Sequence, residues 1–335
     1  MRDVIPFSIL DLAPIRRGDS VGDALRGTLD LAQHAERWGY NRFWLAEHHN
    51  MPGIASSSTA VLIGHVAAHT ERIRVGAGGV MLPNHSPLVV AEAFGTLAAL
   101  YGERIDLGLG RAPGTDQRTA RALRHDVQSA HRFEEEIAEL RAYFQDTMPG
   151  QAVQAVPGAG LRVPIWILGS TPNSAVIAAE MGLPYAFASH FAPAHVLDAL
   201  AVYRSRFRPS EDLDRPYVMV GVNAVIADTD DEARHLFTSM QMQFRDVRRG
   251  TPGQMQPPVD GDLRMSPHEA AGVDEMLAVS VVGSPETAHD RIRRIREITE
   301  ADELLFTGQV YDRGAALRSY ELLAQVGEAL APAAA

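Results

Sequence analysis

Short runs of β-branched and aliphatic residues alternate along the chain with longer stretches in which apolar residues recur at helical spacing. The apolar runs predict eight strands, at residues 6–12, 41–46, 74–78, 105–109, 164–168, 185–188, 218–226 and 303–306. Amphipathic stretches such as residues 23–38 and 87–101 lie between most of them. Eight strands that alternate with helices predict an α/β fold, a single (β/α)8 TIM barrel.

Two segments interrupt this alternation and are interpreted as insertion loops within a single barrel domain spanning residues 1–335. Residues 145–162 are rich in Pro, Gly and Gln, and residues 249–267 contain four prolines and three glycines. The second segment lies between units seven and eight, so it could fold over the barrel mouth as a mobile lid. A disordered surface loop explains its composition equally well.

The length and composition suit one large core, since the chain has 335 residues and 46% of them are hydrophobic. No run of about eighteen apolar residues and no leader-like segment is present, so we expect a soluble, cytoplasmic protein without a membrane partner. The sequence has no cysteine, which excludes disulfides, thiolate nucleophiles and cysteine-ligated metals.

The charged residues exclude further classes of protein. The net charge of −11 disfavours a nucleic-acid partner, because such a partner requires a basic face. All 31 basic residues are arginine, so the chain can form no lysine Schiff base and has no P-loop lysine. An anionic cofactor would therefore be held by arginines and helix N-termini.

Polar and small residues gather where the predicted strands end, and these ends meet at one face of a barrel. The second strand ends in Glu47-His48-His49. The candidate cofactor contacts follow the third, fourth and fifth strands and are Gly78, Gly79, Asn84, Arg111, Gly169, Ser170 and Thr171.

The two histidines invite a metal site, but adjacent residues of a strand point to opposite faces and the helical HExxH spacing is absent. We therefore predict no metal. The alternative that the His–Glu pair only stabilises the strand end stays open.

Arg111 lies near the predicted helix start at Thr171, and together they favour a phosphate site. The alternatives are that Arg111 forms an ion pair and that Thr171 is an ordinary N-cap. The glycines allow either close approach of a flat ligand or tight packing.

Four blocks of the sequence resemble the bacterial luciferase-like flavin monooxygenase family. They are FWLAEHH (43–49), VGAGGVMLP (75–83), RIDLGLGR (104–111) and PIWILGS (164–170), in the right order and spacing. The resemblance spans nearly the whole chain and is closest to the broad group of bacterial oxidoreductases within that family. It implies a (β/α)8 barrel that binds FMN at its C-terminal mouth, commonly as a homodimer.

The resemblance also assigns roles to individual residues. It places the flavin phosphate near Arg111, Thr171 and the start of the fifth helix, with Arg132 as a further contact. It implies a non-proline cis peptide at Gly78-Gly79 against the flavin ring. By the same comparison His48 is the catalytic imidazole and Glu47 the neighbouring carboxylate of the site.

Two departures from the luciferases themselves concern light emission. Gly110 stands where they have a cysteine, and Ser170 stands where they have an acidic residue. We therefore expect flavin binding without light emission from long-chain aldehydes.

The predicted function is a monooxygenase that uses reduced FMN from a separate flavin reductase, and O2, to oxidise a small organic substrate. One alternative is a hydride-transfer oxidoreductase that uses the deazaflavin F420. Another is a protein that binds or stores flavin without catalysis. The sequence does not identify the substrate, whose pocket we expect to be shaped by Ser189-His190-Phe191 and residues 249–267.

Overall fold

The computed structural model describes residues 5–112, 115–124 and 132–331. Its centre is a closed barrel of eight parallel strands, which confirms the predicted (β/α)8 fold. In order around the ring the strands are β1 (Phe7–Asp11), β2 (Arg42–Leu45), β3 (Arg74–Met81), β4 (Ile105–Gly110), β5 (Ile165–Gly169), β6 (Tyr185–Phe187), β7 (Val218–Ile226) and β9 (Glu303–Thr307).

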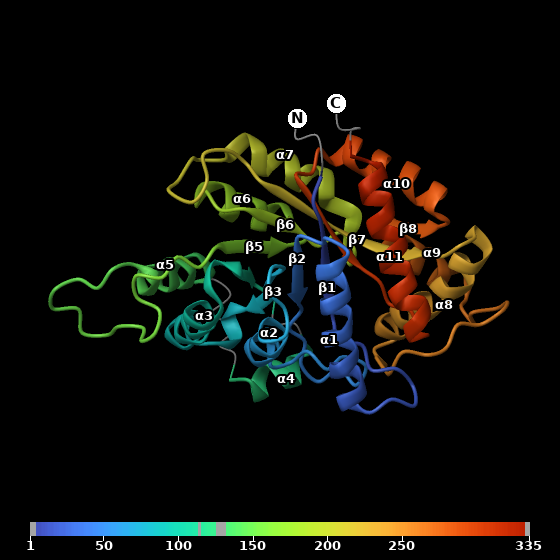
Figure 1. Cartoon of the computed structure of the whole chain (residues 1–335), viewed down its shortest axis with the longest axis horizontal. Coiled ribbons are helices and arrows are strands. Elements are labelled where there is room, and N and C mark those ends of the chain that lie inside the picture. The colour runs from blue at the N-terminus through green and yellow to red at the C-terminus, as the bar shows by residue number, and fades with distance from the viewer. Residues whose placement is uncertain (1–4, 113–114, 125–131, 332–335) are drawn as a thin grey trace.

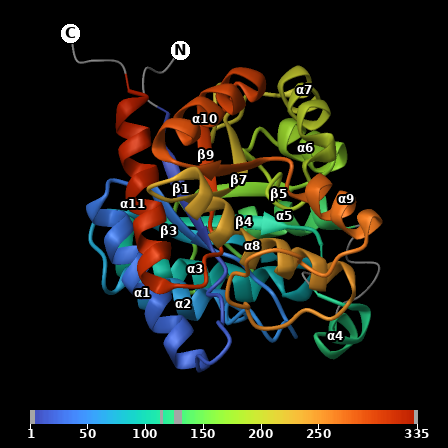
Figure 2. The ribbon, with the colours of Figure 1, turned by 90° about the vertical axis from the view of Figure 1, so that its right-hand side faces the viewer.

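The helices surround the barrel, as two perpendicular views show (Figures 1 and 2). The α-helices are α1 (Val21–Arg37), α2 (Thr59–Ala67), α3 (Pro87–Tyr101), α4 (Gln117–Ala122), α5 (Phe133–Phe144), α6 (Pro172–Glu180), α7 (Val196–Arg206), α8 (Asp230–Arg248), α9 (Pro267–Met276), α10 (Pro285–Thr299) and α11 (Arg313–Ala329). Within the described residues, three short 3-10 turns are η1 (Leu82–Asn84), η2 (Gly102–Arg104) and η4 (Pro193–His195).

Alternate residues of each strand face the barrel interior and the helices, which is why both kinds of position are apolar. Trp44 and Trp166 meet inside the barrel in an edge-to-face contact, with ring centroids 5.2 Å apart. Phe43 and Leu45 face the other way and join the larger core between strands and helices. A polar residue at an interior position just beyond a strand therefore enters the barrel mouth.

The eight predicted strands all exist, but the prediction missed a ninth, β8 (Ser280–Gly283). This strand pairs only with the end of β7, from Asn223 to Ile226, and adds an edge outside the closed ring. Four residues with a single partner strand give too little periodicity to be recognised in the sequence.

The two insertion segments differ in how they are attached. Residues 145–162 extend from the end of α5 away from the barrel, in green in Figure 1. They expose the apolar side chains of Met148, Val153 and Val156. In the second segment, Met255 is fully buried and forms a bridge to the loop after β1. Its N–H donates to Ile15 O at 2.9 Å, and its carbonyl accepts from Arg17 N at 2.8 Å. The mobility of residues 249–267 stays a prediction.

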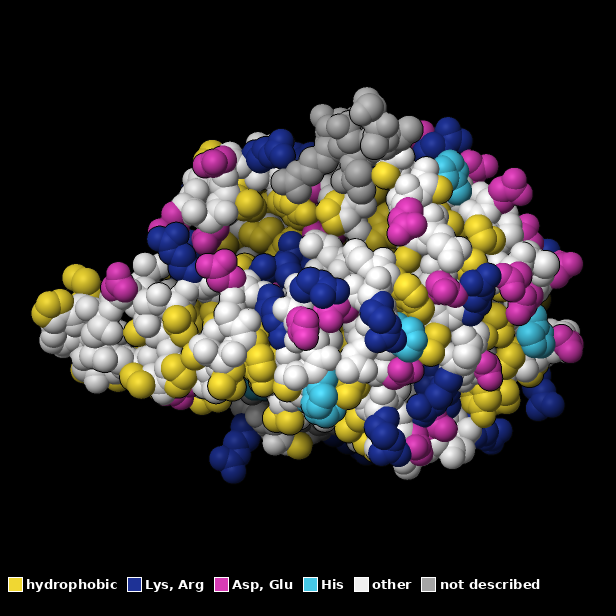
Figure 3. Space-filling model, in the orientation of Figure 1, with side chains coloured by type: hydrophobic (Ala, Val, Ile, Leu, Met, Phe, Trp, Pro, Cys, Tyr) yellow, Lys and Arg dark blue, Asp and Glu magenta, His cyan; other side chains and the backbone are white. Residues whose placement is uncertain are grey.

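Acidic and basic side chains are interspersed over the face seen in Figure 3. Among the described residues, no helix is both long and apolar enough to cross a membrane.

Candidate active site

His48 lies at the C-terminal mouth of the barrel, just beyond β2. Trp44 and Ala46 belong to the interior cluster, so strand alternation carries His48 into the same row. Its N–H donates to Ser56 O at 3.2 Å. Its Nδ1 is buried and has no hydrogen-bond partner in the described part of the chain. Burial lowers the pKa of His48, although the charge of Glu47 acts in the opposite direction.

Glu47 points away from this row and is almost completely buried, at 2% exposure. Its carboxylate accepts hydrogen bonds from His49 Nε2 at 2.9 Å and from His85 Nε2 at 2.9 Å. It also accepts from Met81 N at 3.1 Å and from Asn84 Nδ2 at 3.3 Å. Burial raises the pKa of Glu47, but bonds from His85, His49 and Met81 N outweigh it and lower the pKa overall. Glu47 thus fixes the segment after β3, and His48 and His49 have different surroundings.

The glycines of β3 allow the strand to pack closely against the interior side chain of Leu10 from β1 and against the backbone of β4. A Cβ on Gly78 would lie 2.7 Å from Leu10 Cδ1, and one on Gly79 would lie 2.7 Å from Gly108 O. The bond between Gly78 and Gly79 is cis, as the family resemblance implied. The register with β4 shifts between Ala77 and Val80. Tight packing therefore suffices to require glycine here, whether or not a ligand also approaches.

The ends of β4 and β5 bring Arg111 near the start of α6, because Gly110 pairs with Leu168 in the sheet. Arg111 is exposed and forms no ion pair within the described residues. Thr171 is the N-cap residue of α6, but its hydroxyl makes no capping hydrogen bond. Ser174 Oγ instead donates to Thr171 O at 2.7 Å. A free guanidinium, a free hydroxyl and a helix N-terminus suit an anionic group.

Two other candidate cofactor contacts lie together at a different place. Asn84 and Arg132 line a cavity of about 450 Å³, together with His85 and three glutamates of α5. Arg132 is the N-cap residue of α5 and is exposed. Asn84 donates to Glu47, so part of its amide is already used. The sequence places His85 after the third strand, next to Asn84, but indicates no partner or role for it.

A scan of the whole chain against known families decides its membership. The family model described as luciferase-like monooxygenase matches residues 5–301. The chain belongs to this luciferase-like monooxygenase family.

Two relatives cover nearly the whole chain, and a third covers about half of it. A luciferase-like monooxygenase of Escherichia coli K12 is 52% identical over 328 residues, covering 97% of this chain and 98% of that protein. YvbT of Bacillus subtilis is 52% identical over 322 residues, covering 96% of each. An N-acetyl-S-alkylcysteine monooxygenase of Bacillus subtilis is 42% identical over 190 residues, covering 55% of this chain and 57% of that protein.

Several solved structures share the fold. Apo-MsnO8 has a TM-score of 0.87 and 35% identity, and the match covers 97% of this chain and 98% of that one. The oxygenating constituent of 3,6-diketocamphane monooxygenase of Pseudomonas putida, solved with FMN, has a TM-score of 0.71 at 17% identity and covers 98% and 99%. An F420-dependent secondary alcohol dehydrogenase, solved with an F420–acetone adduct, has a TM-score of 0.70 at 13% identity and covers 97% and 99%. Neighbours with this fold thus bind FMN or F420.

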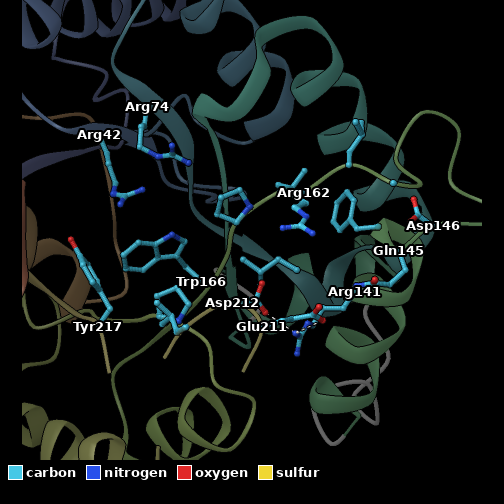
Figure 4. Close-up of a pocket in the computed structure, with 18 residues that line it drawn as sticks. Arg42, Arg74, Arg141, Gln145, Asp146, Arg162, Trp166, Glu211, Asp212 and Tyr217 are labelled. Carbon is cyan, nitrogen blue, oxygen red and sulfur yellow. Dashed lines mark hydrogen bonds and ion pairs between the residues drawn. The ribbon is translucent and has the colours of Figure 1, made fainter. Parts of the chain in front are cut away.

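A cavity of about 690 Å³ opens at the opposite, N-terminal end of the barrel, where Arg42 and Arg74 begin their strands. Figure 4 shows both arginines near Trp166 at this cavity. Arg42 pairs with Asp106 at 2.7 Å and with Glu303 at 3.0 Å, and Arg74 pairs with Asp106 as well. Both carboxylates are fully buried. This charge network serves the stability of the barrel, as is usual at the N-terminal face of the fold.

Proposed function

We propose that this chain is a flavin-dependent monooxygenase that uses reduced FMN and O2 to oxidise a small organic substrate. The observation that carries the proposal is His48, an imidazole at the barrel mouth whose Nδ1 is buried without a partner. Because burial lowers its pKa, the ring is neutral at neutral pH and can donate or accept a proton at Nε2. Membership of a monooxygenase family supports the same reaction class.

The residues at the mouth fit FMN. In this proposal Arg111 and Thr171 hold its phosphate, together with the backbone of Gly169 and Ser170 at the start of α6. The Gly78-Gly79 segment would hold its ring. When bound, reduced FMN supplies the electrons that activate O2. His48 hydrogen-bonds the reacting group, and Glu47 acts as a positioning residue through its bonds to the segment after β3.

A separate reductase is part of the proposal, because the sequence contains no G-x-G-x-x-G segment that could bind a nicotinamide nucleotide. We place both proteins in the cytoplasm, where reduced nicotinamide nucleotides are available to the reductase.

The chain is further proposed to form a homodimer through α2 and α3. These neighbouring helices expose Val61, Val89 and Leu100, at 68%, 58% and 66%. Large apolar side chains are seldom left this exposed on neighbouring helices, so we expect a second copy of the chain to cover them in a dimer interface. Light scattering of the purified protein should give twice the chain mass of 36.4 kDa.

The central experiment titrates the protein with FMN, reduced FMN and reduced F420. Oxygen uptake is then screened with a flavin reductase against aldehydes, ketones, sulfonates, amines and N-acetyl-S-alkylcysteines. We expect tighter binding of reduced than of oxidised FMN, and oxygen uptake coupled to substrate oxidation. The last group of compounds is included because of the substrate named for the Bacillus subtilis relative.

His48→Ala should retain FMN and lose turnover, whereas His195→Ala, on an exposed 3-10 turn, should keep both. Undiminished oxidation by His48→Ala would contradict the role of His48. Anaerobic turnover with reduced F420 would favour hydride transfer, the reaction class supported by the alcohol dehydrogenase neighbour. Tight flavin binding without oxygen uptake would favour storage.

A further inference from the structure

A second imidazole faces the mouth from the opposite side of the barrel. His190 follows β6, while His48 follows β2. Four steps separate these strands in either direction around the ring, through β3, β4 and β5 or through β1, β9 and β7. The strands are therefore diametrically opposed. The two rings nevertheless approach closely enough for a charge on His48 to lower the pKa of His190.

Contacts with β7 hold His190 in place. Ser189 is fully buried, and its hydroxyl donates to Gly221 O at 2.5 Å. The buried amide of Asn223 donates to His190 O at 2.8 Å. The ring itself rests on Gly221, where a Cβ would lie only 2.3 Å from Nδ1. Glycine at position 221 thus makes room for the imidazole, and the hydrogen bonds of the Ser189 hydroxyl and the His190 carbonyl to β7 fix the backbone that carries the ring.

The surroundings keep this imidazole neutral and orient it. Burial, with a smaller contribution from His48, lowers the pKa of His190 to about 4. Nδ1 of His190 is buried and has no hydrogen-bond partner among the described residues. Nε2 is not a buried atom without a partner, and it makes no hydrogen bond to the described part of the chain. Nothing in the described part of the chain holds a proton on Nδ1, so the neutral ring carries it on Nε2. His190 is thus an uncharged donor at the mouth.

We propose that His190 is a substrate-binding residue whose Nε2–H donates a hydrogen bond to an uncharged carbonyl oxygen of the organic substrate, of the ketone or amide class. A neutral donor suits such an acceptor, since a carboxylate would instead call for a paired cation in so buried a place. His48, on the other side of the mouth, then acts at the reacting end of the bound substrate. The proposal rests on the monooxygenase function proposed above.

Variants at position 190 test the hydrogen bond in the FMN-loaded protein, with cyclohexanone and the uncharged N-methylamide of N-acetyl-S-ethylcysteine as probes. His190→Phe keeps the flat ring and removes the donor, and His190→Gln places an amide N–H near the position of Nε2. We expect His190→Phe to raise KM about tenfold with little change in kcat, and His190→Gln to recover most of the loss. Gly221→Ala should raise KM as well, because the new methyl group displaces the ring. His195→Phe, at an exposed position nearby, should leave KM unchanged.

Nitrogen NMR of the histidine rings gives a test that does not need turnover. We expect His190 to be neutral at pH 6, protonated at Nε2, and shifted at Nε2 when either probe is added. An unchanged KM in His190→Phe, a charged ring at pH 6 or an absent shift with both probes would each overturn the proposal. If the wild-type protein oxidises neither probe nor any compound of the screen, the monooxygenase function fails, and the shift at Nε2 still decides whether His190 binds a carbonyl compound.

Discussion

The Glu47 carboxylate accepts a hydrogen bond from His85 Nε2 at 2.9 Å, which ties the end of β2 to the segment that follows β3. The same carboxylate accepts a hydrogen bond from Met81 N at the end of β3, so one buried charge holds the backbone of the strand end and the His85 side chain beyond it. Since a catalytic carboxylate needs a free oxygen, this arrangement favours a positioning role for Glu47 over direct chemistry.

Replacing Glu47 by Gln tests this role. The amide cannot accept from both imidazoles and from Met81 N, so we expect the free energy of unfolding to fall by about 2–3 kcal/mol. Urea denaturation at pH 7 measures the change. Glu328→Gln, at an exposed position, is the matched control and should be neutral. Because the pKa of Glu47 is lowered in the folded state, the difference from wild type should shrink as the pH falls below the usual carboxylate range.

Phosphate recognition can be tested by replacing Arg111 by Gln. Loss of one charge-assisted hydrogen bond should weaken FMN binding about tenfold and leave riboflavin, which lacks the phosphate, unaffected. Flavin fluorescence titration measures both affinities. Arg162→Gln is a matched control, since Arg162 is also exposed but lines the cavity at the opposite end of the barrel. Equal losses for FMN and riboflavin would show that Arg111 does not contact the phosphate.

The sequence predicted those features that depend on local periodicity. Alternation along β2 sufficed to separate His48 from His49, and the βα alternation sufficed for the barrel. The sequence could not predict contacts between residues on different strands of the barrel. The space for His190 depends on Gly221, and the partners of Glu47 include His85, 38 residues further along the chain. Neither relationship leaves a periodic signal, because each follows from strand order and register.

The anchor of residues 249–267 gives a further prediction. Met255 is fully buried and bridges to the loop after β1, so Met255→Ala should weaken this attachment by about 2 kcal/mol. The open population should then rise roughly 30-fold, and trypsin should cleave faster after Arg249 and Arg264. Met148→Ala, which truncates a methionine at 69% exposure on the other insertion, is the control. Equal cleavage of wild type and Met255→Ala would mean that the bridge does not hold the segment.

The neutral state of His190 predicts how stability depends on pH. Its pKa is about 4 in the folded protein, whereas an unfolded chain binds the same proton near the ordinary value of 6.5. The unfolded state therefore takes up the proton first as the pH falls, and stability is lost between about pH 6.5 and pH 4. The full shift corresponds to about 3 kcal/mol. We expect about 1–2 kcal/mol, because His190 as a whole residue is half-buried, although its Nδ1 is buried.

Urea denaturation of wild type and His190→Phe at pH 7, 5.5 and 4.5 measures this contribution. The variant lacks the titrating group, so its stability relative to wild type should rise steadily as the pH falls through this window. His195→Phe corrects for loss of an exposed histidine from the same region. A pH-independent difference between wild type and His190→Phe would mean that the imidazole titrates normally in the folded protein. The ring would then be charged in mildly acidic solution, and its assignment as a neutral donor to a carbonyl oxygen would fail with it.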